Sequence, residues 1–130
     1  MLFVCTRNSA RSRLAAALWT SRTGRSASSA GTDPADRIHR GALSAAKRAG
    51  VHMMDEAPIA LGAIPRNTQV VTVCDLVHED LEASDDWWHW SIPDPVVSGS
   101  ARAFDAVVDD IDRRIRRLHL SPDNQSGAST

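Results

Sequence analysis

The residues with the clearest chemical potential lie at the start of the chain. An apolar run from Leu2 to Val4 leads into Cys5, and Arg11 and Ser12 follow after a five-residue loop. Between a strand and a helix, such a Cys-x5-Arg loop can turn its backbone N–H groups towards one point, which also faces the positive end of the helix dipole. The sequence therefore predicts a cradle for a tetrahedral oxyanion, bound by Thr6, Arg7, Asn8, Ser9, Ala10, Arg11 and Ser12.

Several side chains of this loop have distinct expected roles. The Arg11 guanidinium offers two parallel N–H donors to phosphate-like oxygens, and its charge at a helix N-terminus becomes favourable once an anion binds. The same positive field favours the thiolate form of Cys5, which would then be a nucleophile near neutral pH. The Ser12 hydroxyl could donate a hydrogen bond to that thiolate, and Asn8 is expected to adopt a turn conformation inside the loop.

Asp94 and Cys74, which lie much later in the chain, are further candidates. Asp94 lies between Pro93 and Pro95, on a stiff, extended loop expected near the carboxyl end of the last strand. There it could protonate a leaving oxygen and then act as a base, or it could simply be an Asx-turn residue. Cys74 ends the clearest strand at the same edge of the sheet. It is either a small apolar core residue or a resolving thiol that attacks an oxidised or adducted Cys5.

Short apolar runs alternate with helical patterns along most of the chain. β-Branched runs predict strands, and apolar residues at helical spacing predict helices. Because strands that alternate with helices form parallel sheets covered on both faces, we predict an α/β fold. The stretch 51–67, with two prolines and a glycine, is expected to hold at most one short helix. The expected strands are 2–4, 27–30, 69–74 and 88–90, and the expected helices are 12–22, 39–49, 75–81 and 101–118.

Length and composition bound the class of protein. The 130 residues suffice for one domain, placed at 1–120, and the polar tail 121–130 is expected to be disordered. A net charge of −1 gives no reason to expect nucleic acid or an anionic membrane as a partner. Two cysteines do not make a secreted disulfide scaffold, and no signal peptide or membrane span is visible, so we expect a cytoplasmic location. The histidines lack metal-ligand spacing, so no metal is expected.

Taken together, these motifs resemble the low-molecular-weight protein tyrosine phosphatase superfamily, and within it most closely the thiol-coupled arsenate reductases. The resemblance extends to about Leu118. It rests on LFVCTxNSxRS at 2–12, SAGT at 29–32, VVTVCD at 70–75 and HWSIPDP at 89–95. It implies a single domain with a four-stranded parallel sheet flanked by helices. It also implies Cys5 as nucleophile, Arg11 as oxyanion clamp, Ser12 as thiolate stabiliser and Asp94 as general acid.

Departures from the family patterns favour the reductase branch. Tyrosine phosphatases of this family carry Asp-Pro-Tyr at the acid loop, whereas here Val96 follows the proline and the chain has no tyrosine. The second cysteine that they often carry in the anion loop is replaced by Ala10. In the reductase branch, a cysteine in the position of Cys74 attacks the arsenylated nucleophile. Many such reductases also have a third cysteine that relays the disulfide outwards, but the stretch 76–81 contains none.

The resulting hypothesis is an arsenate reductase. Cys5 would attack arsenate bound in the loop, Asp94 would protonate the departing oxygen, and Cys74 or a small thiol would release arsenite. No bound cofactor is expected, and the reductant would be mycothiol, glutathione or a thioredoxin-type redoxin. Two alternatives stay open. One is a phosphatase acting on phosphotyrosine or a small phosphoester, and the other is a non-catalytic oxyanion- or arsenic-sensing module of a larger regulator.

Overall fold

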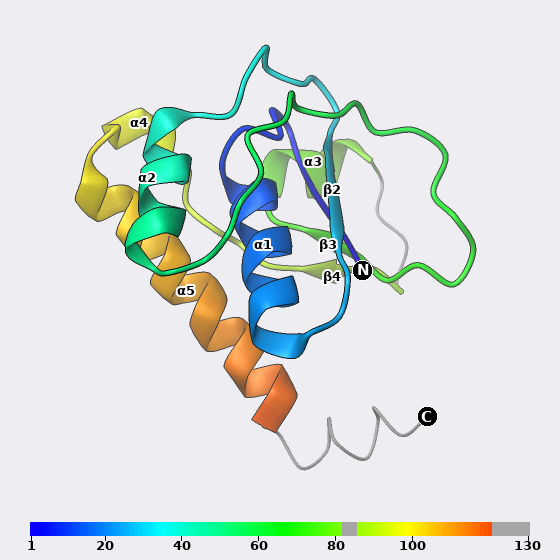
Figure 1. Cartoon of the computed structure of the whole chain (residues 1–130). Helices are drawn as coiled ribbons and strands as arrows, with labels where there is room; N and C mark the ends of the chain where they lie inside the picture. The colour runs from blue at the N-terminus through cyan, green and yellow to red at the C-terminus, as the bar shows by residue number, and fades with distance from the viewer. Residues whose placement is uncertain (82–85, 121–130) are drawn as a thin grey trace.

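The protein is described by a computed structural model, which defines residues 1–81 and 86–120 (Figure 1). One parallel sheet has the strand order β2-β1-β3-β4. Its strands are β1 (Leu2–Cys5), β2 (Ser28–Gly31), β3 (Val70–Thr72) and β4 (Trp88–His89). The helices are α1 (Arg11–Thr23), α2 (Arg40–Arg48), α3 (Asp75–Asp80), α4 (Pro95–Ser98) and α5 (Ala101–Leu120). The predicted α/β fold with a four-stranded parallel sheet flanked by helices is confirmed. The tail predicted at 121–130 lies outside the described residues.

The strand order determines where a ligand can enter. From the inner strand β1, the chain first crosses to β2 on one side and later to β3 on the other side. At such a reversal the loops that follow the two strands turn away from each other, which leaves a crevice at the carboxyl ends of the strands. The loop after Cys5 and the segment that begins at Val73 flank this crevice, so the topology brings the two cysteine-bearing segments to one edge of the sheet.

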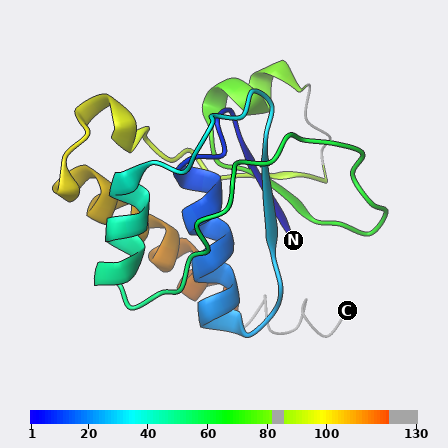
Figure 2. The same ribbon diagram turned by 45° about the horizontal axis from the view of Figure 1, so that its top comes forward.

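The core holds β1 rigidly against the helices. All four residues of β1 are buried, and the Phe3 ring packs between Trp19 and Trp90, with centroid distances of 6.2 and 5.5 Å. Helix α1 contacts β1, β2, α2 and α5, so the three longest helices form one layer beside the sheet (Figure 2). Gly41 leaves room for the Phe104 ring, because a Cβ atom there would lie 2.4 Å from Cε2 of that ring.

Two local expectations were wrong near the predicted site. The strand expected at 69–74 ends at Thr72, and Cys74 instead precedes the first residue of α3 in an extended conformation. The loop 93–95 is not extended throughout, because Pro95 opens the single-turn helix α4. Proline suits the first position of a helix, and the Asp94 side chain caps it by accepting a hydrogen bond from the Val96 N–H at 3.0 Å.

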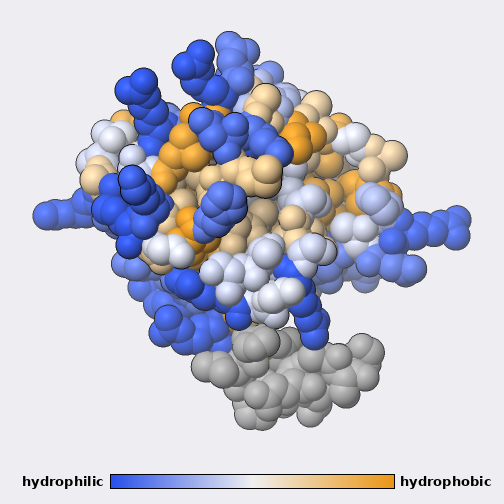
Figure 3. Space-filling view, in the orientation of Figure 1, coloured by the Kyte–Doolittle hydropathy of each residue, from blue (hydrophilic) through white to orange (hydrophobic). Residues whose placement is uncertain are grey.

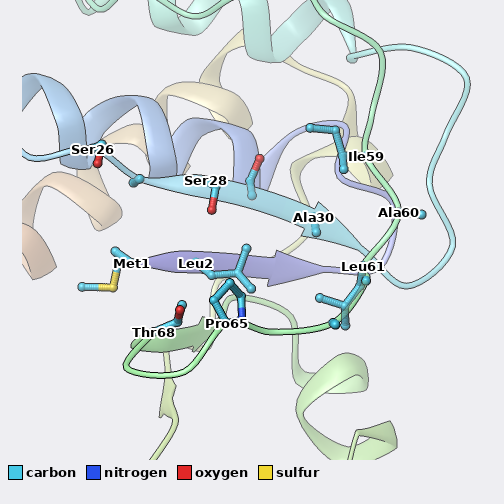
Figure 4. Close-up of a pocket in the computed structure, with 14 residues that line it drawn as sticks. Met1, Leu2, Ser26, Ser28, Ala30, Ile59, Ala60, Leu61, Pro65 and Thr68 are labelled. Atoms are coloured by element: carbon cyan, nitrogen blue, oxygen red, sulfur yellow. The ribbon is translucent and has the colours of Figure 1, made fainter.

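The stretch 51–67 has no helix and runs beside β2. The N–H of Gly31 donates to the Ile59 carbonyl and the N–H of Leu61 donates to the Gly31 carbonyl, both at 2.8 Å, so this segment adds a short parallel bridge at the edge of the sheet. Between the segment and the strands lies a cavity of about 450 Å³ (Figure 4). Its lining residues include no Cys, His, Asp, Glu, Lys or Arg, so it offers no ionisable side chain for chemistry.

Candidate active site

The loop after β1 has its peptide groups oriented by the segment that follows β2. The carbonyl groups of Cys5, Thr6, Arg7 and Ser9 accept hydrogen bonds of 2.8 to 3.1 Å from amides between residues 32 and 39. In residues 1–81 and 86–120, by contrast, no acceptor meets the N–H groups of residues 9–12. Because one side of the loop is used for folding, the open amides at the start of α1 are left as donors for an anion.

The Cys5 thiol is surrounded by hydrogen-bond donors. Its Sγ lies 2.9 Å from Ser12 Oγ and 3.2 Å from the Asn8 N–H. Asn8 Nδ2 donates to the same Ser12 oxygen at 2.8 Å, which leaves the hydroxyl hydrogen of Ser12 free to point at the sulfur. All three residues are buried. This geometry suits a sulfur atom that accepts hydrogen bonds, as a thiolate does.

Two contacts with residues outside the loop, Ile59 and Gly31, brace this arrangement. Asn8 has a φ of 52°, a left-handed conformation that asparagine tolerates, and its Oδ1 accepts a hydrogen bond from the Ile59 N–H at 2.9 Å. Gly31 lies against the loop, and a Cβ atom there would be 2.6 Å from the Thr6 carbonyl oxygen and 3.0 Å from Asn8 Cβ. The shape of the anion loop thus requires that Gly31, at the end of β2, has no side chain.

Replacing Gly31 with alanine is therefore expected to displace the loop. Backbone atoms cannot yield as a flexible side chain can, so we expect turnover to fall on the order of 10²-fold and stability to fall by about 1–3 kcal/mol. Steady-state kinetics and thermal unfolding measure the two effects. Gly62→Ala is the matched control, because a Cβ atom at Gly62 meets nothing within 4 Å. Equal activity of the two variants would contradict the prediction.

Arg11 and Asp94 meet across the mouth of the loop. Arg11 Nη1 donates to the Ile92 carbonyl at 3.0 Å, and Arg11 Nη2 lies 3.9 Å from Asp94 Oδ2. The other carboxylate oxygen, Oδ1, caps α4, so Oδ2 is left for a proton or an incoming oxygen. Cys5, Arg11 and Asp94 line one cavity of about 510 Å³. The structure thus brings together the three residues predicted to be nucleophile, clamp and acid, although Asp94 lies 89 positions after Cys5 in the sequence.

Cys74 lies on the other flank of the loop. Its Sγ is 3.5 Å from Thr6 Oγ1, a side chain of the anion loop itself. Burial alone would raise the pKa of the Cys74 thiol, but the Thr6 hydrogen bond, the backbone amide of Val77 and the charge of Arg11 outweigh it, so the pKa is lowered. The sequence offered no sign of this contact, because a single sequence does not reveal which side chains at positions 6 and 74 face each other.

The lowered pKa of Cys74 has a measurable consequence. In the Cys5→Ser variant, the ultraviolet absorbance of the Cys74 thiolate should appear at a lower pH than it does in the unfolded chain. Adding Thr6→Val should raise the pH midpoint of this transition. Between the folded-state pKa and the ordinary value of about 8.5, the unfolded chain binds more protons at this site. The free energy of unfolding should therefore increase as pH rises through that interval. A midpoint at or above the unfolded value would contradict this prediction.

A polar network secures the segment that leads to Asp94. The Asp75 carboxylate lies 2.7 Å from His89 Nε2 and accepts a hydrogen bond from Ser91 Oγ at 3.1 Å. Hydrogen bonds from His89 and then from Ser91 lower the pKa of Asp75. On its other side, His89 Nδ1 lies 2.8 Å from Oγ1 of the buried Thr72. The end of β3 is thereby fastened to the loop that leads to Asp94.

Arg7 differs from the other residues predicted to bind the oxyanion. Its guanidinium Nη1 donates to Asp33 at 2.7 Å, in an exposed ion pair beside the loop. The side chain is thus engaged outside the cradle, and any contribution of Arg7 to anion binding would come from its backbone. In residues 1–81 and 86–120, no three His, Cys, Asp or Glu residues are grouped so that they could hold a metal ion.

Cys5 lies at the end of an inner strand, beside open backbone amides and Arg11. This arrangement is typical of the class of proteins that bind tetrahedral oxyanions at a cysteine. The chain belongs to the low molecular weight phosphotyrosine protein phosphatase family, whose model matches residues 1–126. This family is one of enzymes. A search of curated proteins found no match.

Solved structures of two functional kinds share the fold. Arsenate reductase from Archaeoglobus fulgidus is 24% identical, with a TM-score of 0.72 over 90% of this chain and 96% of that chain. The arginine phosphatase from Geobacillus stearothermophilus is also 24% identical, with a TM-score of 0.75 over 99% and 96%. The thioredoxin-dependent arsenate reductase from Corynebacterium glutamicum is 26% identical, with a TM-score of 0.70 over 92% of this chain and 59% of that chain. Both reductases and phosphatases are thus similar to the protein, so the choice between reactions depends on the site.

No helix in the described part of the chain is long and apolar enough to cross a membrane.

Proposed function

We propose that the protein is an arsenate reductase in which Cys5 is the nucleophile and Cys74 is the resolving thiol. The observation that carries this proposal is the position of Cys74, whose Sγ is 3.5 Å from Thr6 Oγ1 of the anion loop. Phosphoester hydrolysis needs a nucleophile, a clamp and an acid, but it has no use for a second thiol beside the loop. A second thiol whose pKa is lowered is, however, what a reductive step requires.

The first half of the reaction uses the loop and the acid. Arsenate would bind to the open amides of residues 9–12 and to Arg11. The Cys5 thiolate attacks arsenic, an As–O bond breaks, and Asp94 protonates the departing oxygen so that it leaves as water. Donors that are fixed before the reaction stabilise the developing charge. The product of this half is a Cys5–S–As(V) adduct.

The second half moves two electrons. The Cys74 thiolate attacks Cys5 Sγ, an S–S bond forms, and the electron pair of the S–As bond passes to arsenic, which leaves as arsenite. One arsenate and two thiols thus give one arsenite, one disulfide and one water. An external reductant, either a small thiol or a thioredoxin-type redoxin, restores both thiols by disulfide exchange. Oxidation of the two cysteines gives the proposal a direct signature.

Intact mass of the purified, reduced protein tests the proposal. Addition of arsenate should remove the mass of two hydrogens, and phosphate should leave the mass unchanged. Cys74→Ser should lose this change, and Cys5→Ser should lose it as well. An unchanged mass combined with hydrolysis of an aryl phosphate, equally fast in Cys74→Ser, would assign the protein to the phosphatases instead. An unchanged mass without hydrolysis, but with bound oxyanion, would favour the sensing module.

A further inference from the structure

The cavity that contains Cys5 is larger than its proposed substrate requires. Its volume of about 510 Å³ lies in the range of sites that bind whole small molecules, whereas a tetrahedral oxyanion would occupy the inner end near Cys5 and Arg11. The cavity is also lined by residues of the segment between β2 and α2, by Arg40 at the start of α2 and by Val96 of α4. A second chemical group can therefore occupy the site together with the oxyanion.

The charges in this cavity are strongly unbalanced. Four arginines line it and face a single acid, Asp94. Two of the arginines are already engaged, Arg7 with Asp33 and Arg11 with Asp94 and the Ile92 carbonyl. The other two, Arg37 and Arg40, have no ion pair or hydrogen bond from their side chains anywhere in residues 1–81 and 86–120. Outside the cavity, Arg22, Arg48 and Arg114 are each paired with an aspartate, whereas other exposed arginines, such as Arg25 and Arg66, have no ion pair within the described residues.

The other lining residues of the cavity indicate what kind of chain a ligand of the arginines would have. The lining also includes the apolar side chains of Ala35, Ile38 and Val96 and the imidazole of His39, and no Phe or Trp is among the lining residues. The one ring among the lining residues, His39, is already stacked on Phe104 with a centroid distance of 4.9 Å, so a short aliphatic chain fits these contacts better than an aryl ring. Hydrophilic side chains project at the top of Figure 3, above the carboxyl edge of the sheet, and hydrophobic patches lie beside and below them.

We propose that Arg37 and Arg40 form a carboxylate subsite for an acidic, aliphatic thiol that acts as the reductant. This inference rests on the proposed function, because it names the class of molecule that restores Cys5 and Cys74. Cys5 lines the cavity and Cys74 does not. A thiolate that enters here would attack Cys5 Sγ of the disulfide and expel the Cys74 thiolate, and a second thiolate would attack the mixed disulfide and release Cys5. Two reductant thiols become one disulfide, and the two electrons reduce the protein.

Binding of small phosphonates tests the subsite without any redox step. The probes are phosphonocarboxylates with two-, three- and four-carbon chains, propylphosphonate as the match that lacks a carboxylate, and benzylphosphonate as the aromatic one. Calorimetry on the reduced protein should show that at least one phosphonocarboxylate binds on the order of three- to tenfold more tightly than propylphosphonate, as expected for two partly exposed ion pairs. Arg37→Ala/Arg40→Ala should remove the difference. The control Arg25→Ala, an exposed arginine outside the cavity, should preserve it.

Turnover then identifies the source of the carboxylate. The double variant should raise the KM for glutathione about three- to tenfold and leave the KM for cysteamine, which lacks a carboxylate, unchanged. If no phosphonocarboxylate binds better than propylphosphonate while inorganic phosphate binds, the subsite is refuted and the proposed function is untouched. If the probes show the subsite but the glutathione KM does not change, the carboxylate belongs to a second group on the oxyanion substrate, and the assignment to the reductant is overturned. If phosphate itself fails to bind, the anion loop and this inference both fall.

Discussion

Replacing Cys5 with serine is expected to abolish turnover, with a loss on the order of 10⁴-fold or more. A serine hydroxyl stays protonated near neutral pH and cannot form a disulfide, so neither the attack on the oxyanion nor the reductive step can proceed. The variant should still fold and bind phosphate, because the open amides of residues 9–12 and the Arg11 guanidinium are unchanged. The measurements are arsenite release, aryl phosphate hydrolysis and phosphate binding by calorimetry.

The serine variant separates chemistry from binding. Cys74→Ser serves as its partner, since it removes the other thiol and leaves the loop intact. Retention of turnover within tenfold in Cys5→Ser would show that the nucleophile lies elsewhere. Loss of phosphate binding as well as turnover would show instead that the sulfur has a mainly structural role, as a hydrogen-bond acceptor for Ser12 and Asn8.

Replacing Arg11 with lysine is expected to lower kcat/KM on the order of 10²–10³-fold while the protein stays folded. Lysine keeps the positive charge but loses the planar pair of donors, so the loss measures the geometry of the clamp rather than its charge. The change also removes the hydrogen bond to the Ile92 carbonyl, through which Arg11 holds the segment that leads to Asp94.

Steady-state kinetics at several pH values, together with circular dichroism, check this prediction. Arg25→Lys is the matched control, since Arg25 is exposed and lies outside the cavity. A loss of less than about fivefold in Arg11→Lys would mean that the backbone amides alone provide the oxyanion site. An equal loss in both variants would point to a general effect of charge or stability.

Local sequence carries much of the fold and part of the site. The apolar run that ends at Cys5, the five-residue loop and the helical pattern after Arg11 are contiguous, so their conformations depend on residues that are neighbours in the chain. The alternation of strands and helices then requires a parallel sheet, and its carboxyl edge gathers the loops. For this reason the α/β fold and the placement of Cys5 with Arg11 were predictable from the sequence, whereas the family was predicted from the resemblance of its motifs.

Boundaries set by longer-range contacts were less predictable. The run 69–74 is rich in β-branched residues throughout, yet the strand ends at Thr72, and after a last hydrogen bond from the Val73 N–H to the Val4 carbonyl the chain turns at Cys74 into α3. Likewise, Pro95 can open a helix or stiffen an extended loop, and in the structure it opens a turn of helix that Asp94 caps.

By itself, the sequence determined the cysteine loop, its strand and helix, and the acid between two prolines, because each is encoded in adjacent residues. The tertiary structure alone decided which distant groups meet. It placed Cys74 beside Thr6, fitted Gly31 against the anion loop, joined Asp75 to His89 and Ser91, and left Arg37 and Arg40 uncompensated in the cavity of Cys5. The physical reason is that these contacts depend on strand order and on side-chain directions across the carboxyl edge of the sheet. No spacing along the chain specifies either of them.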